Sequence, residues 1–108
     1  MNPLEIQKQL AELTQENTKG AEALYAAEVR LAEAENELDL VEQRAFIKAE
    51  GTVADRTALS KLESADARLQ RDLRKAEFNR VRVKIRGLET AIMAVATQAK
   101  LIQAELRS

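Results

Sequence analysis

The sequence predicts an all-α protein, a long antiparallel two-helix hairpin of the coiled-coil type that self-associates into a helical bundle. Three observations predict this fold. Alanine, leucine, glutamate, lysine and arginine fill 64 of the 108 positions, which is the composition of long helices and coiled coils. Only three glycines and one proline interrupt that pattern. Apolar residues recur at steps of three and four residues, which is the spacing of a helical seam.

The first helix is expected from about Pro3 to about Glu50, with the proline in the first turn, where it is tolerated. A heptad frame runs through it without interruption. The a positions are Leu10, Asn17, Leu24, Leu31, Leu38 and Ala45, and the d positions are Ile6, Leu13, Gly20, Ala27, Ala34 and Val41. The frame stays in phase across Gly20, which favours a continuous helix; alternatively, the poor helix formers of 17–20 break it. Asn17 at an a position is expected to fix the register at a cost in stability.

A turn over residues 50–53 is the one firm interruption that the sequence predicts. Gly51 is able to take the left-handed backbone conformation that ends a helix. Thr52 then serves as the N-cap of the next helix, and Asp55 completes a capping box three residues later. A turn this short forces the two helices to lie antiparallel.

The second helix is expected from about Val53 to Arg107, with a less regular apolar pattern. One stripe consists of Ala58, Leu59, Leu62, Ala65, Leu69, Leu73 and Ala76, and a second of Phe78, Val81, Ile85, Leu88, Ile92, Val95, Ala99, Ile102 and Leu106. The two stripes are offset, so the seam is expected to shift near 76–81. Residues 80–86 alternate basic and β-branched side chains as a strand does, but no second strand is available to pair with them, which favours helix.

Self-association is expected because each helix of a hairpin buries only one stripe and the pair encloses no core. The apolar face of the C-terminal third is also wider than one partner helix needs. The residues expected at the interface of a dimer or higher oligomer are Leu88, Ile92, Val95, Ala99, Ile102, Leu106, Leu10 and Leu13. The alternative is a stable monomeric hairpin.

The net charge of −1 is the sum of an acidic first helix and a basic central part of the second. Between Arg68 and Arg86 the chain has eight basic residues against two acidic ones. Five of them follow helical steps along about 27 Å and are the candidates for contact with nucleic-acid phosphates: Arg68, Arg71, Lys75, Arg82 and Arg86.

Neutralisation within the assembly is the alternative for these bases, and an acidic partner protein is a third interpretation. Two triplets repeat at heptad spacing and match in level when the helices are paired about the turn: Glu28, Glu35 and Glu42 with Lys75, Arg68 and Lys61. The apolar stripes place the two triplets along opposite edges of the seam. This placement favours ion pairs between chains over ion pairs within one chain.

Enzymatic chemistry is not expected from this composition. The absence of histidine and cysteine excludes the common triads, thiol chemistry and His- or Cys-ligated metals. We therefore predict no catalytic, cofactor-binding or metal-ligating residue and no small-molecule substrate. No apolar run is long enough to span a membrane, the N-terminus lacks the pattern of a signal peptide, and a cytoplasmic location is expected.

The segment 44–56 resembles the middle of small helical-hairpin proteins of actinobacterial phages. Those proteins share a pattern that is matched here by Phe46, Ile47, Lys48, Ala49, Gly51, Thr52, Val53 and Arg56. The match covers about 13 to 25 residues around the turn. Members of this family often sit near phage recombination and replication genes, so the resemblance implies an accessory role in DNA metabolism, in the cytoplasm of the host cell. It implies no catalytic residue.

The function predicted from the sequence is that of a non-enzymatic, oligomeric coiled-coil accessory protein. It would assist DNA recombination or replication by binding protein, nucleic acid or both. The alternatives are an inhibitor or interaction protein that binds a host protein, and a passive structural scaffold.

Overall fold

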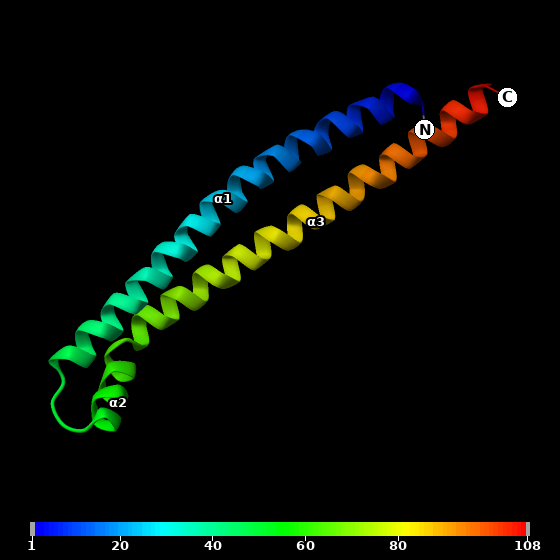
Figure 1. The fold of residues 1–108 in the computed structure, drawn as a ribbon. Coiled ribbons are helices and arrows are strands. Elements are labelled where there is room, and N and C mark those ends of the chain that lie inside the picture. Colours follow the sequence, from blue (N-terminus) through cyan, green and yellow to red (C-terminus); the bar gives the residue numbers. More distant parts are fainter. Residues whose placement is uncertain (1, 108) are drawn as a thin grey trace. The chain divides into compact units, whose positions relative to one another are not determined.

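The computed structural model describes residues 2–107 and is all-helical over them (Figure 1). The helices are α1 (Pro3–Lys48), α2 (Val53–Glu63) and α3 (Ala65–Arg107). Helix α1 is continuous through Gly20, which confirms the unbroken interpretation of that segment. The strand-like residues 80–86 lie within α3, and no strand occurs among the described residues.

Close contacts divide the described chain into two compact units. Unit 1 combines α1 up to Leu24 with α3 from Arg80 onward, and unit 2 is the segment Tyr25–Asn79. The helices run antiparallel within each unit. In unit 1, Gly20 lies against Ile85, and Ile6 lines a groove with Ile102. In unit 2, Arg30 pairs with Glu77 and Glu42 pairs with Arg68. The division falls beside 76–81, where the two apolar stripes of the sequence are offset.

The linker between α1 and α2 has the predicted glycine turn and capping box. Gly51 has a φ of +104°, in the left-handed region. The Thr52 hydroxyl accepts a hydrogen bond from the Asp55 N–H at 3.2 Å, and the Asp55 carboxylate accepts one from the Thr52 N–H at 3.3 Å. Arg56 closes the linker, because its guanidinium donates to the carbonyl of Phe46 at 3.0 Å and lies 4.3 Å from the centre of that ring. Helix α1 ends at Lys48, slightly earlier than expected.

The sequence predicts one continuous helix after the turn, and this prediction is wrong, because the helix is interrupted at Ser64. The Ser64 side chain is fully buried, and its backbone has φ −91° and ψ 5°. Its hydroxyl donates to the carbonyl of Lys61 at 3.3 Å, and the Arg68 guanidinium also reaches that carbonyl at 3.5 Å. A serine that bonds back to a preceding carbonyl competes with the helical ladder and bends it. Figure 1 shows α2 turned away from the first turns of α3.

The heptad frame predicted for α1 is confirmed by the burial of its side chains. Every a and d position between Ile6 and Ala45 is buried or half-buried, and the most deeply buried are Ile6, Ala27, Leu38 and Ala45. Asn17 lies in this frame, and its side-chain oxygen is buried without a hydrogen-bond partner within the described part of the chain. Such a group costs about 1–3 kcal/mol, in line with the stability cost expected of a polar a residue.

The seam of α2 and early α3 differs from the prediction. The residues of the expected stripe, from Ala58 to Ala76, are all exposed, and no shift of the seam occurs. The stripe from Phe78 to Ile102 is half-buried as predicted, although Leu106 is exposed. Its three-four spacing continues backward in phase, so the seam positions of unit 2 are Arg56, Ser60, Ser64, Ala67, Arg71, Arg74 and Phe78.

Small and long polar side chains explain why this seam packs. Ser60 is 7% exposed and donates from its hydroxyl to the backbone carbonyl of Glu42 at 2.8 Å, an approach that a larger residue would prevent. Arg71 and Arg74 are half-buried, because arginine lays its methylene groups along a neighbouring helix while its charged end stays at the edge.

Candidate interaction surfaces

The leucines of the displaced stripe form a solvent-exposed surface on unit 2, which we call the leucine face. It consists of Leu59, Leu62, Leu69 and Leu73, which are 39%, 72%, 54% and 52% exposed. Leu62 lies midway between the seam residues Ser60 and Ser64, and Leu69 lies midway between Ala67 and Arg71. A step of two residues turns about 200° around a helix, so these leucines point away from α1. The α2 and early α3 side of unit 2 therefore has a polar seam and an apolar exterior, and exposed apolar patches of this kind mark interaction sites.

Helix α1 also has exposed apolar side chains on its outer side in unit 2, which we call the α1 outer face. Tyr25, Val29 and Ile47 are 69%, 37% and 73% exposed. Each stands two residues from the buried seam alanines Ala27 or Ala45, again about 200° around the helix. The two apolar faces consequently lie on opposite sides of the helix pair of unit 2. Within the α1 outer face, exposed polar residues separate the first two of these side chains from the third, among them Glu33, Asn36 and Gln43.

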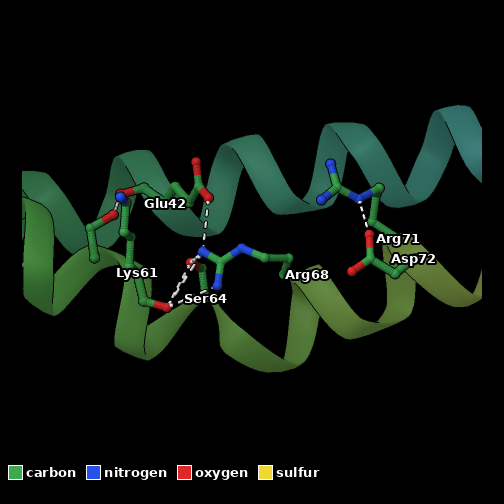
Figure 2. A network of polar contacts seen from close by, with 7 residues as sticks. Glu42, Lys61, Ser64, Arg68, Arg71 and Asp72 are labelled. Atoms are coloured by element: carbon green, nitrogen blue, oxygen red, sulfur yellow. Dashed lines mark hydrogen bonds and ion pairs between the residues drawn. The ribbon is translucent and has the colours of Figure 1, made fainter.

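Two of the five phosphate-contact candidates are held in ion pairs within the chain. Figure 2 shows Arg68 between the two helices, where its guanidinium donates to the Glu42 carboxylate at 3.3 Å and to the Ser64 hydroxyl at 2.9 Å. Arg71 donates to the carboxylate of the adjacent Asp72 at 2.7 Å. Both arginines are half-buried, so their charge is partly satisfied inside unit 2.

The ion pair of Arg68 corrects two expectations about the charged triplets. Arg68 binds Glu42 rather than Glu35. The acidic and basic triplets also share one edge of the seam, not opposite edges as expected, because the true seam runs through Ser64 and Ala67 instead of through the leucines. Each residue of the two triplets comes one position after a seam residue, which is a rotation of about 100° around its own helix. In an antiparallel pair, equal rotations away from the seam bring residues of both helices to the same edge.

The other three candidates are exposed. Lys75 lies on unit 2, and Arg82 and Arg86 lie on unit 1. The surface basic residues Arg80 and Lys84 are also exposed. The five predicted side chains are therefore not equivalent in burial, since Arg68 and Arg71 are half-buried whereas Lys75, Arg82 and Arg86 are exposed.

The opposite edge of unit 2 has a charge cluster that sequence reasoning missed. Glu77 accepts hydrogen bonds from Arg30 at 2.6 Å and from Arg74 at 3.2 Å. The hydrogen bond from Arg30 is the main cause that lowers the pKa of Glu77, Arg74 adds to it, and partial desolvation opposes both. Arg30 is a basic residue in a mainly acidic helix, and Glu77 is an acidic residue in a mainly basic segment. The net charge of each helix therefore does not reveal this pair. A basic residue in the acidic helix opposite an acid in the basic helix is the signal that reveals it.

The residues predicted to form an oligomer interface occupy the seam of unit 1. Leu88, Ile92, Val95, Ala99 and Ile102 of α3 and Leu10 and Leu13 of α1 are half-buried, and Leu106 is 75% exposed. A groove of unit 1 is lined by Ile6, Leu10, Ala99, Ile102 and Leu106 among others, which places these side chains beside each other within one chain. The more exposed leucines of the protein are those of the leucine face and Leu101 and Leu106 of unit 1, together with Leu4.

Two kinds of feature are absent from the described residues. Within residues 2–107 no group of three or more acidic side chains is arranged to hold a metal ion. No helix in this range is both long and apolar enough to cross a membrane. Comparison with known proteins finds no matching family model, no matching curated protein and no matching solved structure.

Proposed function

We propose that this chain is a non-enzymatic, self-associating helical protein, phage-encoded, that serves as an accessory factor in DNA recombination or replication by binding protein chains. The observation that carries the proposal is the leucine face, four leucines on the exterior of unit 2 while serines and arginines occupy its seam. The resemblance of 44–56 to phage hairpin proteins supports the biological setting.

The exposed leucines provide part of the free energy that a specific contact needs. Full burial of a leucine side chain stabilises by about 1.5–3 kcal/mol. Because roughly half of each of the four side chains is exposed, covering the leucine face supplies about 3–6 kcal/mol before the entropic cost of association. Additional contacts must supply the remainder, so association is expected at micromolar concentrations rather than nanomolar ones.

Sedimentation equilibrium tests this proposal. The wild-type chain is expected to associate with rising concentration, and a Leu69→Glu/Leu73→Glu variant is expected to remain monomeric. Leu101→Glu is the matched control, because Leu101 is a similarly exposed leucine of α3 outside the leucine face. Circular dichroism verifies that each variant is helical. A wild-type chain that stays monomeric up to about 100 μM, or a double variant that associates like the wild type, contradicts the proposal.

Nucleic-acid binding is a second candidate function, favoured by the exposed cations Lys75, Arg82 and Arg86. Fluorescence anisotropy with labelled single- and double-stranded DNA tests it. The variant is Arg82→Glu/Arg86→Glu, and Lys100→Glu/Arg107→Glu is the control for an equal change of charge at two other exposed bases of α3. Binding that weakens steeply with salt and is lost only in the Arg82→Glu/Arg86→Glu variant supports this function. No binding at about 50 mM salt excludes it.

A further inference from the structure

We propose that the leucine face is covered by the α1 outer face of a second copy of this chain, in a head-to-tail contact. This inference rests on the proposed self-association and specifies its partner surface. The contact joins Leu62, Leu69 and Leu73 of one copy to Val29 and Ile47, among others, of the next.

The first argument is that the two apolar faces match in position. Both lie on unit 2 and both point away from the seam. The leucine face extends from Leu59 to Leu73 on α2 and α3, whereas Val29 and Ile47 lie about 27 Å apart on α1 with exposed polar residues between them. A symmetric contact between two leucine faces covers one of these surfaces and leaves the α1 outer face in water. A head-to-tail contact covers one surface of each kind in every copy.

The second argument is charge complementarity along one edge of the two faces. Lys61, Arg68 and Lys75 repeat every seven residues on α2 and α3, and Glu28 and Glu35 repeat likewise on α1. The ion pair between Arg68 and Glu42 shows that the basic and acidic rows lie on the same edge of an antiparallel helix pair. When α1 of a second copy packs antiparallel on the leucine face, its acidic row comes to that same edge, beside the basic row.

The charges of these rows are only partly used within one chain. Among residues 2–107, Lys61 and Lys75 form no ion pair, and neither do Glu28 and Glu35. All four side chains are exposed. An antiparallel contact of α3 with α3 would instead bring two basic rows together, and like charges across an interface disfavour the contact. The head-to-tail arrangement is therefore the one that covers both apolar faces and also places opposite charges beside each other.

A head-to-tail contact uses different surfaces on the two partners, so the pair keeps one unused leucine face and one unused α1 outer face. Further copies consequently add at both ends until the assembly closes into a ring or continues as an open array. This behaviour distinguishes it from a symmetric dimer, which stops at two copies.

Complementation between two blocked variants tests the inference. Leu69→Glu/Leu73→Glu blocks the leucine face, and Val29→Glu/Ile47→Glu blocks the α1 outer face. Each variant alone is expected to associate at least ~30-fold more weakly than the wild type, because central apolar contacts carry most of the affinity. An equimolar mixture is expected to form a dimer with one copy of each variant that does not grow further, measured by sedimentation velocity and native mass spectrometry.

Each outcome of the mixing experiment decides between arrangements. If the Val29→Glu/Ile47→Glu variant dimerises alone as well as the wild type does, the leucine faces pair symmetrically, and the inference fails while self-association stands. The inference also fails if both variants are helical and the wild type associates but the mixture stays monomeric. A monomeric wild-type chain overturns the inference and the proposed self-association together.

Charge exchange gives an independent second measurement. Lys61→Glu/Lys75→Glu in otherwise wild-type chain is expected to weaken association about tenfold at low salt. Adding Glu28→Lys/Glu35→Lys to that same chain restores opposite signs along the edge and is expected to recover most of the loss. A combined variant that associates more weakly than the first one contradicts the pairing of these rows.

Discussion

Replacing two helical glycines of unit 1 by alanine tests how closely its helices pack. Alanine is favoured over glycine in a helix interior by about 1 kcal/mol. A Cβ built on Gly87 meets no atom within 4 Å, so Gly87→Ala is expected to show the full gain. A Cβ built on Gly20 lies 3.1 Å from Cγ1 of Ile85 and 3.8 Å from Cδ1 of Leu88. The first of these contacts is tighter than ordinary van der Waals contact, so Ile85 must move.

The cost of that movement sets the expected result for Gly20→Ala. Overpacking typically costs 1–3 kcal/mol, and the half-buried Ile85 places this site near the lower limit, about 1 kcal/mol. The gain and the cost then nearly cancel, and the free energy of unfolding is expected to stay within about 0.5 kcal/mol of wild type. Gly87→Ala is expected to raise the melting temperature by about 4–8 °C.

Thermal and urea unfolding followed by circular dichroism, at one fixed protein concentration, measure both variants. The comparison is internal, because the two substitutions make the same chemical change in the same unit. Equal stabilisation by Gly20→Ala and Gly87→Ala would show that Gly20 does not lie against Ile85, and the reasoning would be refuted.

Three further substitutions follow from the described contacts. Thr52→Ala removes the N-cap of α2 and is expected to lower the free energy of unfolding by about 1 kcal/mol in urea titration, whereas Thr52→Ser retains it. Ser64→Ala removes the hydroxyl that accepts from Arg68 and is expected to cost about 1 kcal/mol in the same assay, with no loss contradicting a role for that bond. Glu77→Gln tests pH linkage: since Arg30 lowers the pKa of Glu77 in the fold, its stabilisation is complete above the ordinary glutamate pKa and is lost as the pH falls through the lowered value. Wild type is therefore expected to exceed Glu77→Gln in melting temperature at neutral pH and to converge with it in acid, and a difference independent of pH contradicts this.

The sequence was sufficient to predict α1 and the turn because their signals are local and agree with one another. The a and d positions of α1 are apolar or small along its whole length, so periodicity identifies the seam directly. Gly51 acts through its own backbone, and the Thr52 and Asp55 side chains each bond to the other residue's backbone N–H, so none of the three needs a tertiary contact to be recognised.

The apolar stripe of α2 and early α3 predicts the wrong seam, because these apolar residues lie on the outer side of the helices. Burial here follows the small size of Ser60 and Ser64 and the alkyl chains of arginines, which a hydrophobicity pattern does not register. The sequence does contain a signal for the true seam. The three-four spacing of Phe78, Val81 and Ile85, continued toward the N-terminus, leads to Ser64 and Ser60. The exposed leucines follow from that spacing, and so does the grouping of the charged triplets on one edge.

The interruption at Ser64 depends on tertiary contacts and has no comparable sequence signal. A serine within a helical pattern is common, and only its complete burial beside Arg68 and the Lys61 carbonyl makes it bend the ladder. The same holds for the pair of Arg30 with Glu77, whose register is set by the packing of the two helices.

The polar seam of unit 2 links its folding to its association. Its seam on α2 and early α3 consists mainly of serine, alanine and arginine rather than leucine, so this side of unit 2 gains less from the hydrophobic effect than the aliphatic seam of unit 1. Anything that binds only the folded form adds to its stability by mass action, and in the proposed self-association that partner is a second copy of the chain. Amide protons of 53–79 are therefore expected to exchange more slowly as protein concentration rises, whereas those of unit 1, whose seam is aliphatic, exchange at rates set mainly by the single chain.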